Sequence, residues 1–243
     1  MVGDPGRLAI LNEKVETRQK QQTRCAGCGQ VAPSYDIVNV GSIEKGYRAI
    51  CAKCFNTEMA KLDGLDRFEH VTFEPVRLAE CTRETHEFHF RTHLFGTGIA
   101  LDAFELRDGH PGGYQFQIIG DPQEDPLVLL GRLIERIRRG LSIKHVCNDE
   151  SGLQIADHLV VRGTIDWDDS QGGSVPLLNV DGREITWQEF GRMLMSFEGW
   201  QFKMEIREKS EGAVSGFPRI SETTQRRRPN QVGASRFARK RRL

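Results

Sequence analysis

Four cysteines near the amino-terminal end carry the clearest chemistry in the sequence. They form two pairs with the spacing C-x2-C-x22-C-x2-C, namely Cys25 and Cys28 in "RCAGCGQ" and Cys51 and Cys54 in "ICAKCFN". Thiolates at this spacing can surround one ion tetrahedrally at about 2.3 Å, and soft sulfur ligands select zinc or iron–sulfur. We predict that these four side chains hold a structural Zn²⁺ with no open coordination position.

The residues around the cysteines favour a small zinc module. Gly27 and Gly29 permit a tight knuckle, and "YDIVNVGSIEKGYRAI" predicts a hairpin that turns near residues 44–46. "FNTEMAKLDG" predicts a short helix that ends at Gly64. Knuckle, hairpin, knuckle and helix together resemble the treble-clef and zinc-ribbon class, in which the four cysteines are the ligands. A redox dithiol and an iron–sulfur cluster remain as alternatives.

Histidines and aspartates elsewhere form a second set of candidates. "THEFHFRTH" contains His86 and His89, and "GTIDWDDSQGG" contains Asp166 and Asp168. Carboxylate and imidazole groups can bind a metal or serve general acid–base chemistry. A metal-dependent hydrolase or nuclease that uses these four residues requires them to converge in one pocket. The sequence contains no nucleophile elbow, P-loop or dinucleotide-binding fingerprint.

The formal net charge of zero conceals a strongly basic end. Residues 217–243 carry net charge +8, and the remainder of the chain carries −8. Clustered arginine neutralises phosphates, so this segment predicts contact with nucleic acid or with an acidic partner surface. A solubilising role is the alternative. The predicted binding residues are Arg226, Arg227, Arg228, Arg236, Arg239, Lys240, Arg241 and Arg242.

Hydrophobic patterning predicts an α+β fold with a largely antiparallel sheet and two main helices. One helix begins at Pro126 with Asp125 as its N-cap and an apolar face of Leu127, Leu130, Ile134, Ile137 and Leu141. The other begins after Thr186, which forms a capping box with Glu189. Strands are predicted at 86–95, 98–106, 114–120, 159–167, 174–180 and 200–208, the last with one buried apolar face.

These elements divide the chain into four predicted parts. They are a polar helix at 1–23, the zinc module at 24–66, an α+β body at 67–208 and a basic, disordered tail at 209–243. No run of about 18 apolar residues and no secretory signal is evident, so we expect a cytoplasmic protein without membrane contact. Reduced cysteines in that compartment agree with metal binding.

Two stretches of the body carry a wider resemblance. "GYQFQIIGDPQEDPLVLLGRLIERIRRGLS" (113–142) and "LNVDGREITWQEFGRMLMSFEGWQFKMEIRE" (178–208) are similar to uncharacterised bacterial proteins that join this body to a small zinc module. The resemblance covers residues 24–208 and implies a bacterial or phage origin. It assigns no activity and no functional residue beyond the four cysteines.

Three functional hypotheses follow from the sequence. The first is a non-enzymatic zinc protein that contacts nucleic acid or an acidic partner through its basic tail. The second is a protein-interaction subunit of a multi-component bacterial or phage system, with a sheet edge or the helix at 187–197 as its interface. The third is the metal-dependent hydrolase or nuclease.

Overall fold

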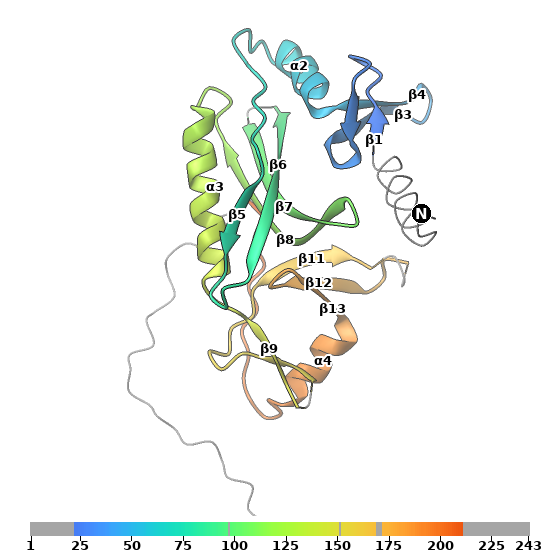
Figure 1. Cartoon of the computed structure of the whole chain (residues 1–243). Coiled ribbons are helices and arrows are strands. Elements are labelled where there is room, and N and C mark those ends of the chain that lie inside the picture. The colour runs from blue at the N-terminus through green and yellow to red at the C-terminus, as the bar shows by residue number, and fades with distance from the viewer. Residues whose placement is uncertain (1–21, 97, 151, 169–171, 211–243) are drawn as a thin grey trace, which may run out of the picture. The chain divides into compact units, whose positions relative to one another are not determined.

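The computed structural model describes residues 22–96, 98–150, 152–168 and 172–210 (Figure 1). The predicted helix at 1–23 and the basic tail at 209–243 therefore lie almost wholly outside the described residues. Within the described ranges the fold is α+β, with three α-helices and only antiparallel strand pairs. This finding confirms the predicted fold class.

The cysteine module contains two short hairpins and a helix. Its elements are β1 (Gln22–Arg24), β2 (Val31–Pro33), the 3-10 turn η1 (Ser34–Asp36), β3 (Ile37–Ser42), β4 (Gly46–Cys51) and α2 (Ala52–Leu62). Strand β1 pairs with β2, and β3 pairs with β4 across the predicted turn. The helix begins at Ala52, earlier than predicted, because Cys51 is its N-cap residue. The second cysteine pair consequently lies at the start of α2.

A four-stranded antiparallel sheet follows the module. Its strands, in spatial order, are β5 (Val76–Ala79), β6 (Thr85–Phe95), β7 (Gly98–Arg107) and β8 (His110–Gly120). Helix α3 (Pro126–Leu141) packs against one face of this sheet (Figure 1). Its N-cap is Asp125, as predicted, and the carboxylate accepts a hydrogen bond of 2.8 Å from the Leu127 backbone nitrogen. Phe88, Leu94, Leu101 and the helix residues form the main core.

The buried face of α3 differs from the predicted one. Leu127 is 68% exposed, while Leu130 and Ile134 are partly buried at the edge of the core. Successive residues of an α-helix are rotated by about 100° around the helix axis. Leu127 precedes Leu129, the first residue of the buried stripe, by two positions, so it lies on nearly the opposite side of the helix from Leu129. The fully buried stripe consists of Leu129, Leu133, Ile137 and Leu141.

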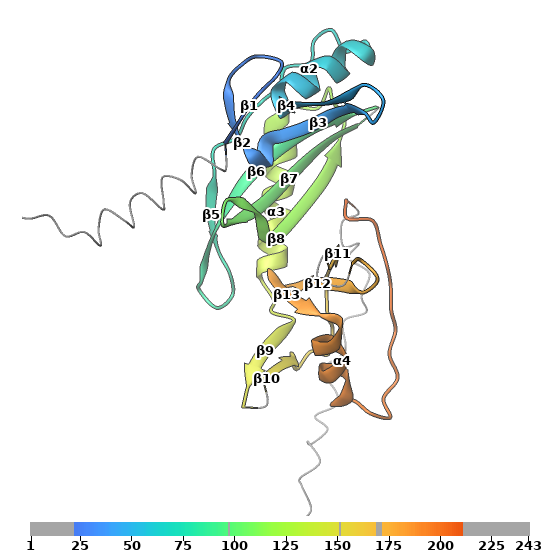
Figure 2. The ribbon, with the colours of Figure 1, turned by 90° about the vertical axis from the view of Figure 1, so that its right-hand side faces the viewer.

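The last described part has a separate small core. It contains the hairpin of β9 (Val146–Asp149) and β10 (Gly152–Ile155), the sheet of β11 (Gly163–Trp167), β12 (Pro176–Val180) and β13 (Arg183–Thr186), and helix α4 (Trp187–Met195) (Figure 2). Both halves of the predicted capping box are present at the start of α4. Its core residues are Val146, Val180, Ile185 and Met193.

One predicted strand is wrong. Residues 200–208 alternate cleanly between apolar and polar, yet they form no strand, and Phe202 is 87% exposed. Trp200, Met204 and Ile206 are also more than 60% exposed. Alternation produces a buried strand face only where a sheet edge supplies backbone partners, and among the described residues none pairs with this segment.

Candidate metal centre

The structure brings the four predicted cysteines together. Their Sγ atoms all lie within 4.8 Å of one another, and those of Cys28 and Cys51 are 4.0 Å apart. A tetrahedral ion with bonds of 2.3 Å requires sulfur–sulfur separations of about 3.8 Å. The spacing of the donor atoms therefore fits a single metal ion bound by four sulfurs.

The backbone of the module is arranged around these sulfur atoms. The buried Sγ of Cys25 accepts N–H groups from Gly27 at 3.3 Å and from Cys51 at 3.2 Å. A Cβ atom at Gly27 would stand 3.0 Å from the Cys54 Sγ, which is closer than an ordinary contact. Gly29 has φ +74°, a conformation that glycine adopts without steric cost. The first knuckle consequently requires these glycines to hold the sulfurs close together.

The thiols of the cluster have divergent acidities. Burial raises the pKa of Cys25, but N–H groups of Cys28, Cys51 and Gly27 outweigh it and lower the pKa to about 6. Burial and the neighbouring thiols raise the pKa of Cys54 to about 12. Four thiolates this close repel one another unless a cation lies among them. The N-terminus of α2 adds a partial positive charge beside the second pair.

Asn56 joins the module to the four-stranded sheet. This residue is 0% exposed, and its Nδ2 donates to the Thr92 carbonyl while its Oδ1 accepts the Leu94 N–H, both at 2.8 Å. The side-chain amide thus makes the backbone hydrogen bonds that a neighbouring strand would make. It does so at a part of β6 with which β5 does not pair. Nδ2 also lies 2.8 Å from His70 Nδ1. The sequence analysis missed Asn56, because a lone asparagine in a helix carries no signal for this contact.

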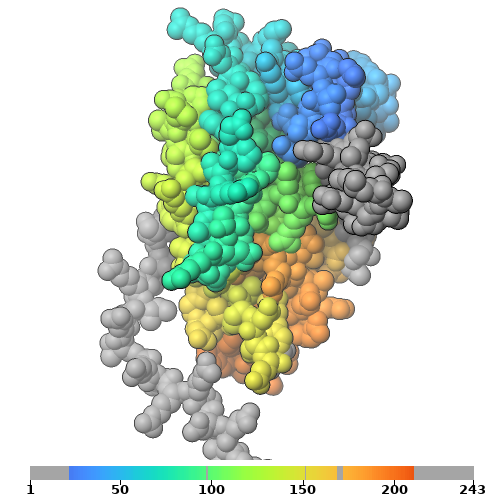
Figure 3. Space-filling model, in the orientation of Figure 1, coloured from blue at the N-terminus to red at the C-terminus, as the bar shows by residue number. Residues whose placement is uncertain are grey.

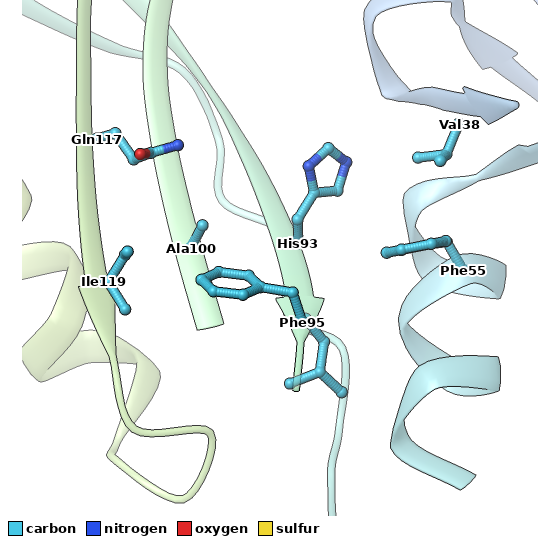
Figure 4. Close-up of a pocket in the computed structure, with 8 residues that line it drawn as sticks. Val38, Phe55, His93, Phe95, Ala100, Gln117 and Ile119 are labelled. Carbon is cyan, nitrogen blue, oxygen red and sulfur yellow. The ribbon is translucent and has the colours of Figure 1, made fainter. Parts of the chain in front are cut away.

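An open pocket of about 330 Å³ lies beside this junction (Figure 4). Burial and the charge of Arg91 lower the pKa of His93, whose Nε2 has no hydrogen-bond partner. A neutral imidazole among apolar side chains gives the pocket little electrostatic character. Its lining consists of Val38, Phe55, His93, Leu94, Phe95, Ala100, Gln117 and Ile119.

The other predicted site residues do not form one site in the described part of the chain. His89 lies 3.5 Å from a Glu87 carboxylate oxygen, and Asp166 accepts a hydrogen bond from Thr164. The metal-ligating groups found among the described residues include His86 but not His89, Asp166 or Asp168. His86 instead has glutamates as its neighbours.

Two further cysteines lie outside the four-cysteine cluster. Cys81 and Cys147 are both exposed. The reason is position: Cys81 lies in the turn between β5 and β6, and Cys147 lies in the short hairpin β9–β10. The eight basic residues predicted to bind nucleic acid, between Arg226 and Arg242, lie outside the described residues.

Three family models match this chain. Each is described as a domain of unknown function: DUF7685 at residues 24–66, DUF7686 at 69–142 and DUF7713 at 143–211. The first range contains the cysteine module, and the second contains the four-stranded sheet with α3. No curated protein and no solved structure matches the sequence. In the part of the chain that the structure describes, no helix has the length and apolar character needed to cross a bilayer.

Proposed function

We propose that this chain is a non-enzymatic zinc protein of a reducing compartment such as the cytoplasm, with a module of the treble-clef or zinc-ribbon class. The observation that carries the proposal is the set of four Sγ atoms within 4.8 Å of one another. Cys25, Cys28, Cys51 and Cys54 would hold Zn²⁺, which would supply structural cohesion. Four protein ligands leave no position for a reacting molecule.

The small size of the module core supports a structural role. The buried residues of its own hydrophobic cluster are Cys25, Ala32, Ile50 and Cys51. A core of this size cannot offset the conformational entropy of about forty residues, whereas binding of zinc contributes roughly 10 kcal/mol or more in such modules. The cysteines therefore stabilise the platform from which the rest of the chain acts.

Native mass spectrometry of the full chain tests the metal assignment. We expect one zinc ion per chain, and none after Cys51→Ser. Cys147→Ser is the matched control, because Cys147 is exposed and lies outside the cluster, so it should retain the ion. An iron–sulfur mass, or full zinc occupancy in Cys51→Ser, would refute the assignment.

The partner of this platform is proposed to be nucleic acid. The support is the charge of +8 on residues 217–243, opposed by −8 on the rest of the chain. Lysine and arginine that neutralise phosphates release counterions, so affinity falls steeply as salt rises. On the module, Lys45 and Lys53 are exposed and would add positive charge, whereas Arg48 is paired with Glu58.

A salt titration tests this role directly. The affinity of the zinc-bound chain for a single-stranded oligonucleotide is measured with and without residues 217–243. We expect the truncation to weaken binding at least tenfold and to flatten the dependence on salt. Lys45→Gln with Lys53→Gln controls for charge on the module and should have a smaller effect. Affinity unchanged by the truncation, or binding only to an acidic protein surface, would defeat the nucleic-acid version.

The exposed segment 200–206 favours a second candidate, a subunit that binds another protein of a bacterial or phage system. Apolar side chains at alternate positions in an extended segment are suited to adding a strand to a partner sheet. Phe202→Ser with Ile206→Ser should abolish such an association while leaving stability unchanged, because both side chains are exposed. Gln201→Ser is the matched control. Pull-down with proteins encoded by neighbouring genes, repeated with each variant, measures the effect.

A further inference from the structure

A partly buried polar cluster lies at the end of the four-stranded sheet, away from the cysteines in the sequence. The turn between β5 and β6 contributes two glutamates, and β6, β7, β8 and the residues after α3 contribute the rest. Three members, Glu80, Glu84 and His86, place one ligand atom each within 4.8 Å of the others. The complete cluster is Glu80, Glu84, His86, Glu105, Tyr114 and Lys144.

His86 is the centre of this cluster. Its side chain is 8% exposed, and its Nδ1 lies 2.8 Å from Glu105 Oε1. Its Nε2 lies 3.2 Å from Glu80 Oε2 but has no hydrogen-bond partner. The Tyr114 ring contacts the imidazole edge-on and limits its rotation. An imidazole fixed by a carboxylate at one nitrogen and free at the other has the arrangement of a metal-ligating histidine.

A β-bulge aims Glu105 at His86. The register of β7 and β8 shifts between Phe104 and Glu105, which leaves Gly113 and Tyr114 outside the ladder. The Tyr114 N–H donates instead to Glu105 Oε2 at 2.7 Å. Gly113 has φ +59°, and a Cβ there would collide with that carboxylate. Bulges often redirect a side chain toward a functional site, and here the carboxylate is directed at the imidazole.

Backbone hydrogen bonds fix the conformation of the turn that carries the two glutamates. The Glu80 N–H donates to the Glu84 carbonyl at 2.8 Å, and the Arg83 N–H donates to the Glu80 carbonyl at 2.9 Å. The Cys81 N–H donates to the last residue of α3, Leu141, at 2.9 Å. Glu80 is buried, Glu84 is exposed, and the chain of this turn lies at the molecular surface (Figure 3). An ion can therefore reach the cluster from solvent on the side where Glu84 lies.

The carboxylates of the cluster outnumber its ammonium groups, so the cluster attracts a cation. Glu80, Glu84 and Glu105 supply three carboxylates, and Lys144 supplies one ammonium, 2.5 Å from Glu80 Oε2. The lysine side chain is 28% exposed and reaches in from the segment after α3, so it can swing out to water. Its ammonium occupies the position that a metal ion would compete for.

We propose that Glu80, Glu84 and His86 bind one divalent first-row metal ion, with Glu105 as the positioning residue of His86. Two carboxylates and an imidazole form a harder ligand set than four thiolates, and such a set suits Mn²⁺ or Fe²⁺. Three protein ligands leave at least one coordination position for water, unlike the closed cysteine centre. Binding displaces the Lys144 ammonium from Glu80.

Titration of the zinc-bound full chain with Mn²⁺ tests the proposal, because thiolates discriminate against this ion. The electron paramagnetic resonance signal of free Mn²⁺ measures binding. We expect one saturable Mn²⁺ per chain and an affinity at least about tenfold weaker in Glu84→Gln and His86→Gln. Glu84 is exposed, so its variant separates loss of a ligand from loss of the fold. Lys144→Met should bind Mn²⁺ more tightly, an increase that misfolding cannot produce.

His89→Gln is the matched control. It removes another histidine of β6 that has a different glutamate neighbour, Glu87, and it should leave the Mn²⁺ affinity unchanged. The proposal is overturned if Mn²⁺ does not saturate at one ion per chain. It is also overturned if Glu84→Gln binds as the unaltered chain does, or if His89→Gln weakens binding as much as His86→Gln.

Discussion

The cysteine centre and the Glu80–His86 cluster gather metal-ligating side chains by different routes. Two short C-x2-C turns supply all four cysteine ligands, and almost no hydrophobic core surrounds them. The Glu80–His86 cluster is assembled from three strands, the β5–β6 turn and a segment after α3, next to a core that contains Phe88, Leu94 and Leu101. We therefore expect the first region to need its ion in order to fold, and the second to fold first and then offer the proposed site to an ion.

Removal of metal should give the largest effect, and it should destabilise one region but not the other. A strong chelator applied to the full chain should unfold the module, since roughly 10 kcal/mol of metal binding is lost there. The sheet keeps its own core and should remain folded. Hydrogen exchange followed by mass spectrometry should show lost protection in residues 24–62 and retained protection in β6, β7 and β8.

A cysteine variant supplies the control for the chelator. Cys54→Ser should reproduce the exchange pattern without chelator, and Cys147→Ser should exchange as the unaltered chain does. Equal loss of protection in module and sheet would show that the two regions unfold as one unit. The contrast between a metal-dependent and a metal-independent region would then be wrong.

The same contrast explains what the sequence could predict. The four-cysteine cluster, the β3–β4 hairpin, the Asp125 N-cap and the Thr186 capping box follow from local patterns, and each appears where it was expected. The cluster around His86 depends on a register shift at Glu105 that no spacing reveals. Its only local trace is that Glu80, Glu84 and His86 lie close together in the sequence, across the β5–β6 turn and the start of β6.

Long-range pairing also accounts for the errors. Residues 200–208 have the pattern of a half-buried strand, but the pattern does not guarantee a sheet edge to receive it. The face of α3 was misplaced because Leu127 and Leu129 are both leucines and only the sheet decides which is buried. Asn56 was overlooked for the same reason, since its partners lie on β6.

Asn56→Ala should give the second largest effect, because this side chain connects the two regions. Its loss leaves the Thr92 carbonyl and the Leu94 N–H buried without partners and opens a small cavity. We expect the free energy of unfolding to fall by about 3 kcal/mol. Hydrogen exchange in β6 and β7 at increasing urea concentration measures the change.

Asn39→Ala is the matched control, since Asn39 is exposed on β3 and should change stability by less than about 0.5 kcal/mol. If Asn56→Ala lowers metal content without lowering the stability of the sheet, the amide serves the module alone. A fall in sheet stability with zinc still bound would show that the amide links both regions.

The smallest predicted effect concerns a local feature that needs no metal. The Thr186 N–H and hydroxyl donate to the Glu189 carboxylate at 2.9 and 2.8 Å, and these bonds lower the pKa of Glu189 below its ordinary value of 4.5. Glu189→Gln should destabilise the chain by about 0.5 kcal/mol at pH 7, because it also removes a negative charge from the N-terminus of α4. Urea denaturation at several pH values measures the difference.

The lowered pKa fixes the direction of the pH dependence. The stabilisation is fully present above the unfolded-state pKa near 4.5 and is lost as the pH falls through the lower folded-state pKa. The difference between Glu189→Gln and the unaltered chain should therefore shrink in acid. Glu184→Gln, at an exposed position on β13, is the matched control. A difference that stays constant from pH 7 to pH 3 would mean that the carboxylate charge contributes nothing, and that the cap acts only through the geometry of its hydrogen bonds.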